Sequence, residues 1–178
     1  NTTTTSVNQA AGFSINIYTG TKSNATVGHG LGAVPKMILI KDTTNTESWI
    51  VYHEAVGNDG NLYLNLTSAK VTQAAFQNTT PTSSVFSIGT TDGLNKASAV
   101  HVAYCFAEVE GYSSFGGYTG NGSTDGTFVS TGFKPAFVLL KRTNATQEWQ
   151  MYDTQRDPFN VANHKLEAKS SGAESILT

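Results

Sequence analysis

Leu31-Gly-Ala-Val-Pro-Lys-Met-Ile-Leu-Ile-Lys41 is followed 100 positions later by the similar stretch Thr131-Gly-Phe-Lys-Pro-Ala-Phe-Val-Leu-Leu-Lys141. In each stretch a glycine and then a proline precede four consecutive apolar residues, and a lysine follows them. Proline has no backbone N–H, so it suits the turn or the first position that leads into a strand. A short apolar run between polar residues is typical of a strand buried on both faces. The two stretches therefore predict the same buried β-strand twice.

The similarity between the two halves of the chain extends beyond these strands. Identical residues recur at the same spacing without a gap: Tyr18-Thr-Gly20 with Tyr118-Thr-Gly120, Trp49 with Trp149, and Tyr52 with Tyr152. Between Tyr18 and Tyr52 about a third of the positions are identical to those 100 residues later. A fixed internal period is the signature of repeated structural modules. The chain is therefore predicted to contain a module repeated at about 100 residues.

Strand patterns dominate the rest of the chain, and helix signals are almost absent before residue 155. Phe13 to Tyr18 alternates apolar and polar residues with the period of two expected of a strand with one buried face. Further apolar segments fit strands: Trp49 to Tyr52, Leu62 to Leu66, Val85 to Ile88, and Val102 to Phe106. Abundant Thr, Asn, Gly and Ser suit strands and the turns between them. The predicted fold class is all-β, with jelly-roll-like β-sandwich modules.

The two modules have different extents. Residues 1–11 are predicted to form an N-terminal linker or strand, residues 12–110 the first β module, and residues 111–178 a second, incomplete β module. Tyr112 to Tyr118 is expected to repeat the Phe13 to Tyr18 strand, but no counterparts of the last two strands follow. An unfinished module would expose a sheet edge. The missing strands could lie further along the chain or come from a neighbouring chain by strand addition, or both copies could share one sandwich.

Composition excludes several classes of partner. The formal net charge is −2 and Lys141-Arg142 is the only adjacent basic pair, so no nucleic-acid surface is expected. No apolar run approaches the ~18 residues of a membrane span, so no membrane insertion is predicted. The single cysteine, Cys105, permits no internal disulfide and is expected to be a small buried hydrophobe.

The sequence offers little catalytic chemistry. The four histidines, His29, His53, His101 and His164, form no recognisable metal-ligand spacing. We therefore expect neither a metal nor a cofactor. Glu108 with Glu110, and Asp153 with Asp157, are the carboxylate pairs that a glycosidase could use, but two carboxylates at a strand end, like the first pair, more often form a solvated sheet edge. The chain is predicted not to be an enzyme.

The two tryptophans have two possible roles. Trp49 and Trp149 each lie beside apolar residues, Ile50 and Met151 among them, so we expect both to anchor the core. The alternative is that they stack on sugar rings at the surface.

The order of motifs along the chain resembles that of a known family. These motifs are Tyr-Thr-Gly, Gly-Leu-Gly-x-x-Pro-x-Met-Ile-Leu-Ile-Lys, Trp-x-Val-Tyr-His, and the segments Leu62 to Ala69, Ser84 to Gly89 and Val102 to Ala107. Together they are similar to a tandem β-rich domain of unknown function found in tailed-bacteriophage proteins of the marine type. Members of that family occur in tail-fibre, appendage and other virion-surface polypeptides. The resemblance implies a location in the virion and brings no catalytic residues.

The resulting expectation is a non-enzymatic structural and adhesive protein of a phage virion. It would contact host surface or neighbouring subunits through two loop tips. The predicted binding residues are Asn45, Thr46 and Glu47 in one loop and Asn144, Thr146 and Gln147 in the other. Expected partners are other virion proteins, further copies of the chain and a host cell-surface glycan. The alternatives are a lectin-like carbohydrate-binding module and a polysaccharide depolymerase.

Overall fold

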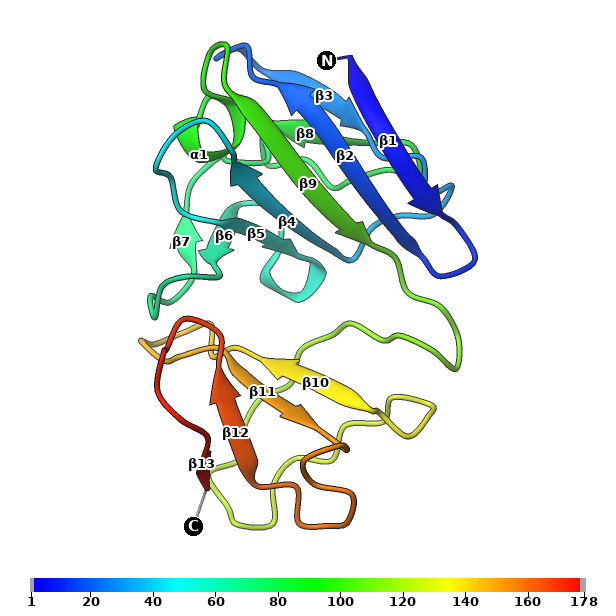
Figure 1. Ribbon diagram of the computed structural model, residues 1–178, viewed down its shortest axis with the longest axis vertical. Coiled ribbons are helices and arrows are strands. Elements are labelled where there is room, and N and C mark those ends of the chain that lie inside the picture. Colours follow the sequence, from blue (N-terminus) through cyan, green and yellow to red (C-terminus); the bar gives the residue numbers. More distant parts are fainter. Residues whose placement is uncertain (1, 177–178) are drawn as a thin grey trace.

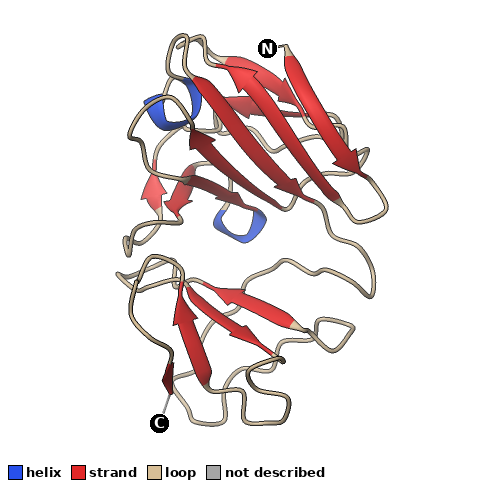
Figure 2. Cartoon of the chain, viewed as in Figure 1, coloured by secondary structure: helices blue, strands red, loops and turns tan. Residues whose placement is uncertain are grey.

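A computed structural model describes residues 2–176 and shows a chain that is nearly all β, with antiparallel sheets. Figure 2 shows strands throughout, with two short helices in the first half. The strands are β1 (Thr3–Asn8), β2 (Phe13–Thr19), β3 (Ala25–Gly28), β4 (Met37–Asp42), β5 (Ile50–His53), β6 (Gly60–Tyr63), β7 (Val71–Thr72), β8 (Val85–Ile88), β9 (Val100–Phe106), β10 (Phe137–Leu140), β11 (Gln150–Asp153), β12 (His164–Glu167) and β13 (Ser175–Ile176). The helices are η1 (Glu54–Val56), of the 3-10 type, and α1 (Asp92–Asn95). The prediction of an all-β chain is confirmed.

The largest sheet has seven strands in the order β1-β2-β9-β4-β5-β6-β7. Strand β9 lies third in this order, inside the sheet, although it comes last of the seven in the sequence (Figure 1). It pairs with β2 on one edge and with β4 on the other, both antiparallel. Of the segments predicted as strands, Val85 to Ile88 lies outside this sheet as β8, and Leu62 to Leu66 is a strand only as far as Tyr63, where β6 ends. We call residues 2–107 the first unit.

One face of the seven-stranded sheet is covered by the antiparallel pair β3 and β8. Ile38 and Ile40 of β4 have no exposed surface and share a core cluster with Val27 of β3 and Phe86 of β8. The apolar run in β4 arises because Met37 and Leu39 pack on the opposite face. Met37 is buried there, and Leu39 is half-buried.

The opposite face of the large sheet packs on the second half of the chain. Met37, Val51 and Leu62 form a second core cluster that includes Trp149, and Leu139 packs against it. Figure 1 shows the second half lying beside this sheet, with β10, β11 and β12 next to one another. The large sheet is therefore apolar on both faces and supports a packed layer on each.

The second half contains a four-stranded antiparallel sheet in the order β10-β11-β12-β13. We call residues 118–176 the second unit. The strand expected at Tyr112 to Tyr118 is wrong: this stretch contains only an isolated bridge between Val109 and Ser113. Strand β2 is held between β1 and β9. In the described residues no such strands flank Tyr112 to Tyr118, and Gly116-Gly117 lowers its strand propensity further.

Among residues 2–176 no helix combines the length and the apolar character that crossing a membrane requires.

Candidate functional site

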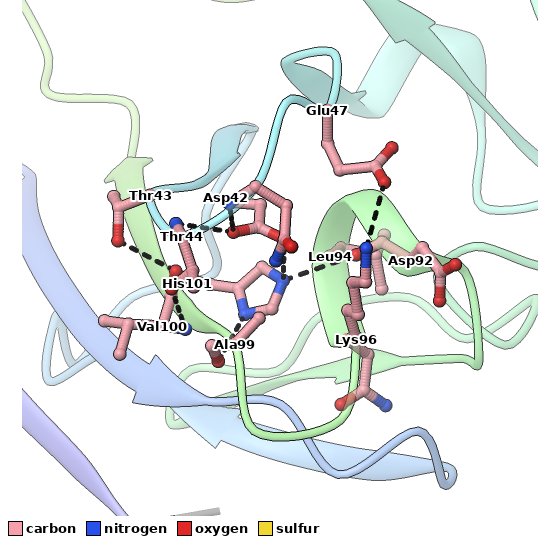
Figure 3. Close-up of polar contacts among 12 residues, drawn as sticks. Asp42, Thr43, Thr44, Glu47, Asp92, Leu94, Lys96, Ala99, Val100 and His101 are labelled. Atoms are coloured by element: carbon pink, nitrogen blue, oxygen red, sulfur yellow. Dashed lines mark hydrogen bonds and ion pairs between the residues drawn. The ribbon is translucent and has the colours of Figure 1, made fainter.

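The loop that joins β4 to β5 is folded around one buried carboxylate (Figure 3). The Asp42 side chain has no exposed surface. Its Oδ1 atom accepts hydrogen bonds from the backbone N–H of Thr44 at 2.7 Å and of Asn45 at 2.8 Å, and its Oδ2 atom accepts one from Asn45 Nδ2 at 3.0 Å. Aspartate often forms turns of this kind because its short side chain reaches the backbone two or three residues ahead. Asp42 therefore fixes the shape of the loop.

These contacts also hold Asp42 in its charged form. Burial on its own would raise the pKa of this carboxyl. The hydrogen bonds from Asn45 and Thr44, and the charge of His101, act in the opposite direction and leave the pKa below its ordinary value. Because the carboxylate accepts all three loop hydrogen bonds, its ionised state and the loop conformation support each other.

His101 forms the floor beneath Asp42 and is itself fully buried. Its Nδ1 atom lies 3.1 Å from the carbonyl oxygen of Ala99, and its Nε2 atom lies 3.4 Å from that of Asp92. A carbonyl oxygen only accepts, so a protonated ring nitrogen of His101 donates to the carbonyl oxygen that it faces. Asp42 Oδ2 lies 3.9 Å from Nε2. The two buried side chains thus lie next to each other beneath the loop, and the His101 ring stacks on that of Tyr18 at a centroid distance of 5.2 Å.

Further contacts tie the loop to the strands around it. Thr43 Oγ1 donates to the carbonyl oxygen of Val100 at 2.9 Å, and the Val100 N–H donates to Thr44 Oγ1 at 2.9 Å. At the rim, Glu47 lies 3.8 Å from the ammonium group of Lys96. Exposed ion pairs of this kind add at most about 1 kcal/mol. The buried Asp42 and His101, rather than the rim, keep the loop in place.

The predicted binding residues of this loop are only partly at the surface. Thr46 is exposed, whereas Asn45 and Glu47 are half-buried and make the contacts described above. Asn45 in particular serves the loop's own structure through Asp42. The loop is therefore a preformed surface feature whose tip presents Thr46, with Glu47 beside it.

The second predicted loop is held against the first unit. The N–H of Gln147 donates to the carbonyl oxygen of Thr67 at 2.8 Å, and the N–H of Lys70 donates to that of Thr143 at 2.8 Å. Lys141 Nζ donates to the carbonyl oxygens of Thr67 at 3.0 Å and Gln147 at 2.7 Å. The side chains of Asn144, Thr146 and Gln147 remain exposed. This loop is thus part of a junction between the two units, whereas the first loop lies beside α1 (Figure 1).

The two tryptophans occupy different environments. Trp149 is only 3% exposed and its Nε1–H donates to the carbonyl oxygen of Tyr63 at 2.8 Å. Trp149 therefore anchors the core, as predicted, but it does so between the units. Trp49 is half-buried and stacks on Tyr104 with ring centroids 6.1 Å apart. The prediction that Trp49 is a buried anchor is wrong: Trp49 lies just before β5, outside the strand, and keeps part of its surface exposed.

An aromatic row, which the sequence analysis missed, runs across the outer face of the large sheet from Trp49. Tyr104 stacks on Phe13 at 6.5 Å, and Phe13 packs against Phe106 at 5.0 Å. All four side chains are half-buried. The alternation of Val102, Tyr104 and Phe106 along one strand was the available signal. This alternation did not indicate which face of the large sheet would keep part of its surface exposed.

The two carboxylate pairs that the sequence offers lie in different surroundings. Glu108 and Glu110 are both exposed. Asp153 accepts a hydrogen bond from Arg156 Nε at 2.7 Å, and Asp157 lies 2.5 Å from His164 Nδ1. Each of the last two carboxylates is therefore paired with its own basic group. Within the described residues no cluster of three or more His, Cys, Asp or Glu side chains has an arrangement that could hold a metal ion.

The chain matches one known protein family. A family described as a domain of unknown function (DUF7483) matches residues 1–177. The chain belongs to this family. No curated protein and no solved structure matches the chain.

Proposed function

We propose that the chain is built from two copies of one β module and that the first copy is a two-layer sandwich. The pairing of Met37 with His53 in β4 and β5 has its counterpart in the pairing of Phe137 with Asp153, each residue 100 positions later. The pairing of Gly60 with Thr72 in β6 and β7 has its counterpart in that of His164 with Ile176, each 104 positions later. A four-residue insertion between β11 and β12 accounts for the difference. The second unit thus corresponds to β4 through β7.

The module pair serves as a non-enzymatic structural and adhesive part of a tailed-phage virion. The observation that carries this proposal is the junction, where Trp149 and the bonds between residues 67–70 and 143–147 join the units. Backbone hydrogen bonds combined with a buried aromatic make such a contact stiff, unlike the flexible linkers that usually separate domains. A rigid block of repeated β modules suits a fibre or surface decoration that must transmit force.

Contact with the host or with neighbouring subunits is made through the 42–47 loop. Asp42 and His101 hold this loop from below, so little conformational entropy is lost when its tip binds. Thr46 and Glu47 provide a hydroxyl and a carboxylate at the surface. Partners in this proposal are other virion proteins, further copies of the chain and a host-surface glycan.

Removing the gene from a phage that encodes it tests this function. We expect particles that lack the protein to change in composition and to adsorb to host cells more slowly. Particles complemented with a variant in which residues 44–47 are replaced by Gly and Ser should contain the protein but adsorb poorly. Particles with unchanged composition and adsorption in the absence of the protein would contradict the proposal.

A lectin-like function is the second candidate, and the aromatic row favours it. Half-buried aromatic rings offer flat apolar faces of the kind on which sugar rings stack. Trp49 lies beside the exposed amide of Asn65, whose Oδ1 accepts from the backbone N–H of Trp49 at 3.0 Å. A glycan array followed by titration with the best ligand tests this idea. Trp49→Ala should abolish saturable binding without unfolding the protein, and Phe137→Ala, at an exposed site in the second unit, is the matched control. Binding that survives Trp49→Ala would contradict it.

A further inference from the structure

The outer edge of β10 is where the second unit differs most from its counterpart in the first. In the first unit, β4 lies between β5 and β9. In the second unit, β10 lies next to β11 at the end of the sheet, and no strand of the described residues pairs with its other edge. An edge strand with unpaired N–H and C=O groups is a template for pairing with another strand.

The residues of β10 correspond to those that β9 covers in the first unit. Ile38 pairs with Cys105 and Ile40 with Ala103, and neither isoleucine has any exposed surface. Val138 and Leu140 occupy the corresponding places on β10 and are half-buried. The second unit therefore keeps the apolar residues of the edge but lacks the small-residue strand that covers them.

Tyr118 gives independent evidence for the same missing cover. Its counterpart Tyr18 is 2% exposed, stacks on His101 of β9 and donates its hydroxyl to the carbonyl oxygen of Leu94 at 2.7 Å. Tyr118 is 55% exposed. The tyrosine is present in both units. The residues that cover Tyr18 come from β9 and α1, and among the described residues the second unit has no counterpart of these two elements.

The apolar character is confined to the β10 side of the sheet face. Further from that edge, Gln150 stands where the first unit has Ile50, and Glu167 stands where it has Tyr63. Lys165 Nζ lies 2.9 Å from Glu167 Oε1, and Tyr152 donates to Gln150 Oε1 at 3.1 Å. These polar side chains are hydrogen-bonded or ion-paired with one another at the surface. The apolar side chains that remain lie at the β10 edge, so a single strand paired with that edge covers them without a complete second layer.

We infer that the outer edge of β10 is a strand-acceptor site for an antiparallel strand of the β9 type. The strand places small residues against Val138 and Leu140 and aromatic residues on the other face, as Val100–Phe106 does for β4. Recognition is mainly by backbone hydrogen bonds, with side-chain pockets setting the register. This inference rests on the repeat proposed above and not on the virion function.

A second copy of the chain is poorly suited to supply this strand. In the first unit the strand comes from the same chain, which proceeds from β7 through β8 to β9. A second copy cannot lend its β9, because that strand is bonded on both edges, to β2 and β4. Its exposed edge strand β1 has the sequence Thr-Thr-Thr-Ser-Val-Asn, which offers only one large apolar side chain.

Fusing the chain's own β8–β9 segment to its end tests the inference. Residues 75–107 are appended after Thr178, where the repeat offset places them, and a scrambled segment of the same composition is the matched control. Backbone amide exchange of Phe137–Leu140 is followed by mass spectrometry in the intact fusion. We expect exchange at β10 to slow at least tenfold in the fusion and to stay unchanged in the control, with Tyr118 becoming less accessible to nitration.

Unchanged exchange at β10 in the fusion would overturn the inference. So would slow exchange at β10 in the unfused chain that speeds up on dilution together with dissociation of a dimer, because a second copy would then occupy the edge. Equal slowing with the scrambled segment would show that any attached chain protects the edge, and would overturn the requirement for a β9-type strand. A change of Leu140→Asp in the fusion should restore fast exchange if the site is used as inferred.

Discussion

Tyr18 and Tyr118 occupy identical Tyr-Thr-Gly sequences 100 positions apart, yet their side chains are 2% and 55% exposed. The difference arises from their neighbours. His101 stacks on Tyr18, and the carbonyl oxygen of Leu94 accepts its hydroxyl. Both covering residues come from the segment between β8 and the end of β9. Identical local sequence therefore leads to burial in one unit and exposure in the other.

Removing the tryptophan between the units should weaken the whole protein. Trp149 is 3% exposed, and truncating a buried tryptophan to alanine typically costs about 3–5 kcal/mol. We expect Trp149→Ala to lower the free energy of unfolding by that amount in urea titrations. Trp49→Ala is the matched control and should cost less, because Trp49 is half-buried. Equal losses for the two variants would contradict the assignment of Trp149 to the junction.

Protonation of His29 should destabilise the fold below neutral pH. The ring is fully buried, its Nε2 atom lies 3.1 Å from the carbonyl oxygen of Thr82, and its Nδ1 atom accepts from the N–H of Leu31 at 3.3 Å. Burial lowers the pKa of His29, and the bond to Thr82 offsets only part of this. Below the unfolded value of about 6.5, the unfolded chain therefore binds a proton that the folded chain does not, so stability falls as pH falls.

Urea titrations at pH 7.5, 6.5 and 5.5 measure this dependence. His29→Gln keeps a neutral side chain at the site and should show a smaller loss between pH 6.5 and 5.5. Some dependence should persist, because burial also lowers the pKa of His53. A variant that loses stability with pH as steeply as the original chain would rule out His29 as a source.

The carboxylate of Asp42 should be essential for the shape of the 42–47 loop. Asp42→Asn replaces one acceptor oxygen by an amino group that faces the Asn45 amide, and it removes the carboxylate that lies 3.9 Å from His101 Nε2. An unsatisfied buried polar group costs about 1–3 kcal/mol. We expect that loss in stability together with faster proteolytic cleavage within residues 43–48. Thr46→Ala, at the exposed tip, is the control and should leave both measurements unchanged.

Cys105 should be inert in the native protein. It is fully buried in the first-unit core, and burial raises the pKa of its thiol to about 12. Thiolate is the reactive form, so a thiol-specific reagent such as Ellman's should react only as fast as the protein unfolds. In urea one thiol per chain should react at once. Rapid stoichiometric labelling in native buffer would contradict this placement.

Most strands of the first unit could be predicted from the sequence because their apolar patterns are local. Met37–Ile40 and the alternation in Phe13 to Tyr18 are visible without knowing the partners. The order of the strands in the sheet is different, because the insertion of β9 between β2 and β4 depends on residues 59 to 69 positions away from their partners in β4. No local pattern specifies that pairing.

The candidate site was only partly predictable, for the same reason. The 42–47 loop follows from a polar stretch between two strands, and the structure confirms it as a loop. The equivalent stretch from Thr143 to Glu148 has the same length and similar composition, but its backbone bonds to Thr67 and Lys70 of the first unit. The role of each loop depends on which segments of the chain pack beside it, and the composition of the loop does not specify those segments.

The rigid junction between the units is most directly tested by fluorine NMR of protein labelled with 5-fluorotryptophan. The chain contains two tryptophans, so two resonances are expected, and Trp149→Phe identifies one of them. A soluble gadolinium chelate should broaden the Trp49 resonance and leave that of Trp149 nearly unchanged, because Trp149 is enclosed between the units. Broadening of the Trp149 resonance as strong as that of Trp49 would show that the units are not locked together.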